Sequence, residues 1–147
     1  MAGFLKPGLV FGLLLGGSAA LAEAETLDGE VTDVVDVTTI EVAGTRIRLA
    51  GIAGPALGEG RGEHSRMTLT YIVHDDAGGV VQCTLSGETR DGLPLATCLT
   101  PAGEDIAALI VDSGAARDCP RESGGRYAEF ENAAALALPL PDRCRVP

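Results

Sequence analysis

Short runs of β-branched residues dominate the chain between residues 31 and 52. Three runs, residues 31–37, 39–42 and 45–52, are rich in Val, Ile and Thr, which favour strands. An Ala-Gly pair separates the second run from the third and is typical of a tight turn. The pattern predicts three antiparallel strands and then a loop over residues 54–62, where four of the nine positions are glycine.

The rest of the chain adds a hairpin and three helical stretches. Residues 80–88 and 93–99 flank an Asp-Gly turn signal and are typical of two further strands. Apolar side chains recur at helical spacing in residues 63–74, 104–113 and 126–138. Five strands with a helix between the third and the fourth follow the element order of an OB-fold. We therefore predict an α+β fold, a five-stranded OB barrel with about three helices.

The first 22 residues have the composition of an export signal. Lys6 supplies a positive charge, residues 9–20 are largely apolar, and the Ala-Leu-Ala that follows has the small-x-small form of a signal-peptidase site. An uncleaved anchor is the alternative, but the apolar run is shorter than the ~20 residues that span a bilayer, and it contains glycines. We expect residues 1–22 to be a cleaved signal. Residues 23–147 are expected to form one periplasmic or secreted domain with no membrane segment.

All the cysteines lie in the predicted mature domain, and an exported protein matures where thiols oxidise. They are Cys83, Cys98, Cys119 and Cys144. Two disulfides among four cysteines allow three pairings, and the hairpin favours one of them. If Glu88 faces Leu93 across a four-residue loop, counting outward places Cys83 opposite Cys98. The remaining pair would then fasten the C-terminal tail. The spacing does not favour a metal site, because no Cys-x-x-Cys pair occurs.

Charge and aromatic content argue against a nucleic-acid-binding protein. The chain has 21 Asp and Glu against 11 Lys and Arg, and its net charge of -10 repels a phosphate backbone. After residue 22, only Tyr71, Tyr127 and Phe130 supply aromatic rings on which bases could stack. We therefore expect the partner to be a protein, a peptide or a small ligand, and not a nucleic acid.

Four segments match the motifs of a known family in the same order. Residues 35–42 carry V-D-V-T-T-I-E-V, and residues 46–55 carry R-I-R-L-A-G-I-A-G-P. R-D-G-L-P-L-A follows within residues 89–98, and D-C-P-R and S-G-G-R-Y lie within residues 118–127. Together they resemble the staphylococcal-nuclease-like (thermonuclease) family, including its exported members, over about residues 31–138. The resemblance implies an OB barrel and calcium-dependent hydrolysis of DNA or RNA phosphodiesters.

The resemblance also implies five active-site positions, of which this chain keeps one. The family's two metal-binding aspartates fall on Thr38 and Ala53, and its catalytic glutamate falls on Ala56. One of its two arginines is kept as Arg48, and the other falls on Leu93. Alanine and threonine do not replace the charged oxygens that bind calcium, and loss of the general base alone removes ~10²–10⁴-fold in rate. We expect no catalysis by this mechanism and no bound cofactor.

Further interpretations of these residues stay open. An active, metal-dependent nuclease with a rearranged site would use Asp36 and Glu59 as oxygen donors for calcium, with Arg48 on the phosphate. Alternatively, Arg48 is a structural arginine that pairs inside the barrel with Asp36 or Glu41. A purely structural role in the cell envelope is a third possibility. We prefer a catalytically degenerate, exported OB domain that serves as a binding or structural module.

Other chemistry-bearing residues form no recognisable pattern. His64 and His74 do not have the spacing of metal ligands, and Ser123 lacks the neighbouring base and acid of a serine nucleophile. A small anion site is one interpretation of Arg121, Arg126 and Tyr127, but capping and salt-bridge contacts are the commoner role on an acidic protein and are expected here.

Overall fold

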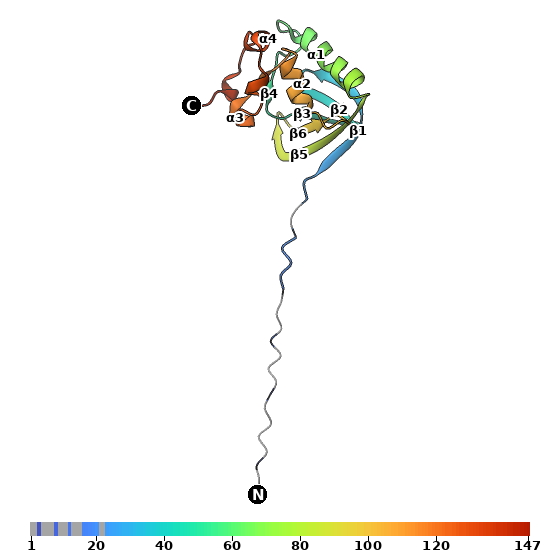
Figure 1. Cartoon of the computed structure of the whole chain (residues 1–147), viewed down its shortest axis with the longest axis vertical. Coiled ribbons are helices and arrows are strands. Elements are labelled where there is room, and N and C mark those ends of the chain that lie inside the picture. The colour runs from blue at the N-terminus through green and yellow to red at the C-terminus, as the bar shows by residue number, and fades with distance from the viewer. Residues whose placement is uncertain (1–2, 4–7, 9–11, 13–15, 21–22) are drawn as a thin grey trace.

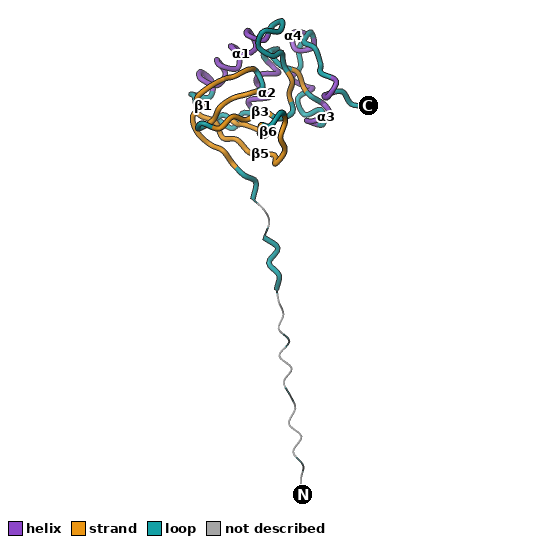
Figure 2. The backbone as a smooth tube through the Cα atoms, turned by 180° about the vertical axis from the view of Figure 1, so that it is seen from behind, coloured by secondary structure: helices purple, strands orange, loops and turns teal. Residues whose placement is uncertain are grey.

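A computed structural model describes residues 3, 8, 12, 16–20 and 23–147 of the chain. The predicted export signal, residues 1–22, therefore lies for the most part outside the described residues. Figure 1 shows a barrel of strands with helices packed beside it, and Figure 2 shows the same arrangement from behind. In the part of the chain that is described, no helix is both long and apolar enough to cross a bilayer.

Five strands close into the predicted barrel. They are β1 (Thr26–Asp36), β2 (Thr39–Val42), β3 (Thr45–Leu49), β5 (Val80–Arg90) and β6 (Leu93–Leu99). Their order around the barrel is β1-β2-β3-β6-β5, and β5 closes onto β1. Neighbouring strands are antiparallel except for β3 and β6, which run parallel because the chain crosses over between them. The OB-type barrel is thus confirmed.

Two helices close the apolar interior of the barrel. The helix α1 (Gly62–Tyr71) continues as a wider turn over Ile72–Asp76, and α2 (Ile106–Asp112) lies after the last barrel strand. Asp105 caps α2, since its carboxylate accepts a 2.9 Å hydrogen bond from the backbone N–H of Ala107. The helix α2 buries Ile106 and Ile110 against the barrel, as the periodicity predicts. The apolar face predicted for the first helix is wrong, because Met67 and Tyr71 are exposed. The first helix and the wider turn after it instead bury Leu69, Ile72 and Val73.

The third predicted strand is shorter than the sequence suggests. It ends at Leu49, because Gly51 takes a φ of +81° and turns the chain away from the barrel. The next two residues form β4 (Ile52–Ala53), which pairs with β7 (Arg117–Asp118) in a separate two-stranded sheet. This sheet attaches the C-terminal segment to the barrel.

The hairpin disulfide is confirmed, but the local pairing behind that prediction is wrong. Asp91 and Gly92 form a two-residue turn with φ values of +51° and +77°, so that Leu93 pairs with Arg90 and not with Glu88. An irregularity between Leu85 and Thr89 takes up the two extra residues, and Cys83 still faces Cys98.

All four cysteines are paired, which also confirms the second predicted bridge. Cys83 is bonded to Cys98, with Cα atoms 4.0 Å apart, and Cys119 is bonded to Cys144, with Cα atoms 4.6 Å apart. Structural disulfides are typical of proteins that fold outside the cytoplasm. They favour an extracytoplasmic location for this chain.

The predicted helix over residues 126–138 is broken into two short pieces. After α3 (Pro120–Ser123) the chain forms a single turn over Ala128–Phe130 and then α4 (Ala133–Leu136). Asn132 explains the break, because its side chain caps α4 at Ala135 and donates a 2.7 Å hydrogen bond to the carbonyl of Asp112. Figure 1 shows α3, α4 and the C-terminus gathered beside β4.

Substitution of Gly51 tests how closely the C-terminal segment packs on the barrel. A Cβ atom there would lie 2.8 Å from Cε2 of Tyr127, whereas Gly103, with a similar φ of +84°, has open space around it. We expect Gly103→Ala to lower the free energy of unfolding by about 1 kcal/mol, from backbone strain alone. Gly51→Ala should cost about 3 kcal/mol, because overpacking adds to the strain. Urea denaturation measures both, and equal losses would contradict the packing argument.

Candidate functional site

The five positions matched to the family's active site lie at the ends of different elements. Thr38 is buried in the turn between β1 and β2, and Arg48 lies near the end of β3. Ala53 is fully buried in β4, Ala56 is exposed in the following loop, and Leu93 begins β6. Nη1 of Arg48 lies 3.4 Å from the hydroxyl of Thr38, so the fold brings these two side chains together.

Asp36 holds the turn in which Thr38 lies. One of its carboxylate oxygens accepts hydrogen bonds from the backbone N–H of Thr38 at 2.8 Å and from the Thr38 hydroxyl at 3.0 Å. This is the local bonding by which aspartate stabilises turns. A carboxylate oxygen in that role already has its donors, and the hydroxyl beside it has no charge to offer a cation.

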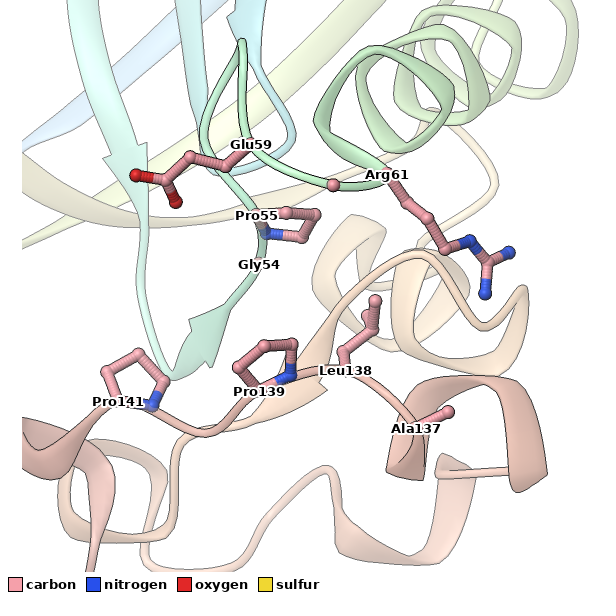
Figure 3. Close-up of a pocket in the computed structure, with 9 residues that line it drawn as sticks. Gly54, Pro55, Glu59, Arg61, Ala137, Leu138, Pro139 and Pro141 are labelled. Carbon is pink, nitrogen blue, oxygen red and sulfur yellow. The ribbon is translucent and has the colours of Figure 1, made fainter.

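Glu59, the second acid of the rearranged-site hypothesis, lies at a different cavity. That cavity, of about 320 Å³, lies between the loop before α1 and the segment after α4. Figure 3 shows the carboxylate of Glu59 and the guanidinium of Arg61 pointing away from each other, with the rings of Pro139 and Pro141 on the opposite wall. Neither Asp36 nor Arg48 lines this cavity. Among the described residues, no three His, Cys, Asp or Glu side chains are grouped so that they could hold a metal ion.

Arg48 pairs with neither of the acids proposed from sequence. Its Nη2 lies 3.2 Å from a carboxylate oxygen of Asp91, at the tip of the β5–β6 hairpin. Glu41 instead lies 3.6 Å from Arg46. The carboxylate of Asp91 is 73% exposed, so the pair with Arg48 is weakly held.

Two further arginines gather beside Arg48, and the sequence analysis did not identify them. We call Arg48, Arg90 and Arg143 the arginine cluster. Glu122 links two of its members, since its carboxylate forms an ion pair with Arg90 and lies 3.7 Å from Nη1 of Arg143. The other oxygen of Glu122 accepts a 2.6 Å hydrogen bond from the backbone N–H of Gly51. Three separate parts of the chain therefore meet at one carboxylate.

Burial and mutual repulsion act on the arginine cluster, and two of its N–H donors have no acceptor in the described part of the chain. Burial and the neighbouring Arg143 and Arg48 lower the pKa of Arg90 to about 10. Burial and Arg48 also lower the pKa of Arg143. In addition, Nε of Arg48 and Nη1 of Arg90 are buried with no hydrogen-bond acceptor among the described residues. Buried donors without acceptors are rare in folded proteins and call for an explanation.

The Cys119–Cys144 disulfide positions the third member of the cluster. Arg143 lies in a short turn, Asp142–Cys144, and Cys144 bonds to the residue just before α3. Nη1 of Arg143 lies 3.4 Å from Sγ of Cys119 and 3.3 Å from Sγ of Cys144. Arg143 is 53 residues away from Arg90 in sequence, so no local pattern could assign it to this site. Only the cysteine pairing pointed to where the tail is attached.

A second group of polar residues anchors α3 and the turn after it. Asp118 accepts hydrogen bonds from the hydroxyl of Ser123 at 2.6 Å and from the backbone N–H of Tyr127 at 3.2 Å. The Tyr127 hydroxyl donates to Asp105 at 2.8 Å, and Nη2 of Arg126 lies 3.0 Å from the same carboxylate. These contacts agree with the capping and salt-bridge contacts expected of Arg126 and Tyr127.

Comparison with known proteins finds a distant relative of the chain. No protein-family model matches the chain. It is similar to the succinoglycan biosynthesis protein ExoI of Rhizobium meliloti (strain 1021), with 29% identity over 121 residues. The match covers 76% of this chain and 62% of the relative, so the chain spans less than two thirds of the relative's length.

The buried phenol of Tyr127 is expected to make stability depend on alkaline pH. Burial, and then the hydrogen bond to Asp105 and its negative charge, raise the pKa of Tyr127. The folded state therefore keeps this proton longer than the unfolded state, whose phenol has a pKa of about 10. The stabilisation is complete below that pH and is lost as the pH rises towards the folded value.

Two variants measure this effect. Tyr127→Phe should lower the free energy of unfolding by about 1 to 2 kcal/mol at neutral pH and by less above pH ~10. The lowered pKa of Arg90 makes the free energy of unfolding rise with pH in the same range. This contribution is present in both the wild-type protein and Tyr127→Phe, so it cancels in their comparison. In Tyr71→Phe, where Tyr127 is the remaining tyrosine, ultraviolet titration should show a higher phenol pKa in the folded than in the unfolded protein. Equal values would contradict the assignment.

Proposed function

We propose that the chain is a thermonuclease-like OB domain that has lost catalysis and acts outside the cytoplasm as a binding module. Three observations support this proposal: the closed five-stranded barrel, the ordered sequence motifs within residues 31–138, and the two disulfides. The family name itself rests on the motifs.

The contact between Thr38 and Asp36 is the observation that carries the proposal. A calcium-dependent nuclease needs several anionic oxygens that converge on the cation. Here Thr38 occupies the position of the first acid, and its hydroxyl donates to Asp36. The next two positions are occupied by Ala53 and Ala56, which have no polar side-chain atom. Without the cation and the base, neither an activated water nor an electrophile for the phosphate is provided.

The relative suggests a context for the binding function. ExoI carries the description of a succinoglycan biosynthesis protein. We extend this to the proposal that the module works where a cell produces extracellular polysaccharide. A purely structural role in the envelope fits the same context, but the two buried donors of the arginine cluster that lack acceptors among the described residues favour ligand binding over a passive role.

A cleavage assay tests the loss of catalysis. The protein, after metal removal, is mixed with fluorescently labelled single-stranded DNA or RNA, and calcium is then titrated in. We expect no turnover at any calcium concentration, because the carboxylates that would hold the ion are absent. An active thermonuclease serves as the positive control.

Asp36→Ala and Glu59→Ala are the matched variants. Calcium-dependent turnover that Asp36→Ala abolishes would establish the rearranged-site nuclease and overturn the proposal. Turnover that neither variant changes would point to a contaminating nuclease. Further purification of the wild-type protein should then remove that turnover.

A further inference from the structure

The acids beside the arginine cluster are exposed, shared between two arginines, or bonded elsewhere. Asp91 faces Arg48 but is largely exposed. One oxygen of Glu122 is bound by Gly51, and the other is shared between Arg90 and Arg143. The carboxylate of Asp36 is also near, yet it accepts from Thr38 and not from Arg48. No guanidinium in the cluster therefore has a carboxylate of its own that is also buried.

Two N–H donors of the cluster need an acceptor that the described residues do not supply. They are Nε of Arg48 and Nη1 of Arg90, both buried. The side chains of Arg48 and Arg90 are largely buried, with exposures of 21% and 13%. Leaving a buried donor unpaired is costly, whereas a charged hydrogen bond to an anion is among the strongest contacts a protein makes. The missing acceptors point to a ligand with oxygen atoms.

We propose that Arg48, Arg90 and Arg143 form a metal-independent binding site for a doubly charged tetrahedral oxyanion, as phosphate or sulfate presents. This proposal rests on the binding function proposed above and gives it a ligand class. Three guanidinium groups arrive from three elements, and a tetrahedral anion has enough oxygens to meet donors from several directions. A planar carboxylate, with two oxygens, is satisfied by a single guanidinium fork. The motif match assigned a role to Arg48 alone, and it assigned none to Arg90 or Arg143.

The net negative charge of the protein favours a small ligand over an extended one. With a net charge of -10, the surface repels an extended polyanion such as duplex DNA. A small anion meets the local field of the three guanidinium groups, and the acids nearest to it, Asp91 and Glu122, are already paired with those groups. Salt screens more distant acids over about 8 Å. The site therefore selects a small oxyanion or one such group on a small molecule.

The Cys119–Cys144 disulfide keeps the site complete. Arg143 is next to Cys144 in sequence, and its guanidinium lies against both sulfur atoms. Arg143 is also 41% exposed and lies 3.7 Å from Glu122, so few other contacts hold it. Opening the disulfide would release the tail and remove one of the three cations. Anion affinity is thus coupled to the oxidation state of this bridge.

Calorimetric titration of the full protein with inorganic phosphate and with sulfate tests the proposal. We expect saturable binding in the presence of a chelator, and much weaker binding of acetate. Arg48→Gln, Arg90→Gln and Arg143→Gln should each raise the Kd about tenfold or more, since each removes a charged hydrogen bond. Arg121→Gln and Arg145→Gln replace exposed arginines outside the cluster and should leave the Kd unchanged. Circular dichroism checks that each variant folds.

The role of the disulfide is tested by a double-mutant cycle. Cys119→Ser with Cys144→Ser should raise the Kd about as much as Arg143→Gln, and should have no further effect in the Arg143→Gln protein. If the disulfide variant does not fold, titration after mild reduction of the bridge in the native protein gives the same comparison. An unchanged Kd after loss of the bridge would overturn the coupling.

The remaining outcomes distinguish a phosphate ester from the free anion as the ligand. They also distinguish the anion-site proposal from the proposed loss of catalysis. Glucose 1-phosphate that binds more tightly than inorganic phosphate would identify a phosphate ester as the ligand, and equal binding would identify the free anion. Absence of saturable phosphate and sulfate binding, or equal losses in the cluster and control variants, would overturn the anion site. Those results would leave the loss of catalysis standing, which only the cleavage assay tests.

Discussion

Glu122 is the side chain on which the arrangement of the site depends. It accepts from the N–H of Gly51 at the end of the barrel and pairs with Arg90 from the hairpin and Arg143 from the tail. Charge-assisted bonds of this kind are stronger than neutral ones, and loss of a buried partner leaves an uncompensated charge. Loss of the Glu122 carboxylate would therefore leave the two guanidinium groups facing each other, and the C-terminal segment would lose one of its polar attachments to the barrel.

In the proposed function, guanidinium groups supply the positive charge that a divalent ion would supply in a thermonuclease. An OB barrel of the thermonuclease kind is expected to place acids around a divalent ion, with arginines facing the phosphate. In this chain the acid positions hold Thr38, Ala53 and Ala56, while arginines from two other segments have gathered beside Arg48. A guanidinium group offers directional hydrogen bonds and a single charge, and it does not activate water as a bound metal ion does. Under the function proposed above, such a site holds an anion and does not hydrolyse it.

Local patterns predicted much of the fold, because barrel strands and hairpins are set by residues close in sequence. The β-branched runs gave β1, β2 and β3, and the hairpin gave the Cys83–Cys98 pair even though the assumed turn was wrong. The pairing of β4 with β7 and the break at Asn132 depend on contacts between distant segments, which no local pattern contains. For the same reason Arg48 could be singled out from a motif, whereas Arg90 and Arg143 appeared only once the chain was folded.

Thermal unfolding of the full protein, compared in phosphate and in calcium, tests the central claim most directly. A ligand that binds only the folded state raises Tm, so the shift reports which ion the site holds. The account predicts that phosphate raises Tm in the presence of a chelator and that calcium, added in its place, does not. A Tm that rises with calcium and is unmoved by phosphate would contradict it.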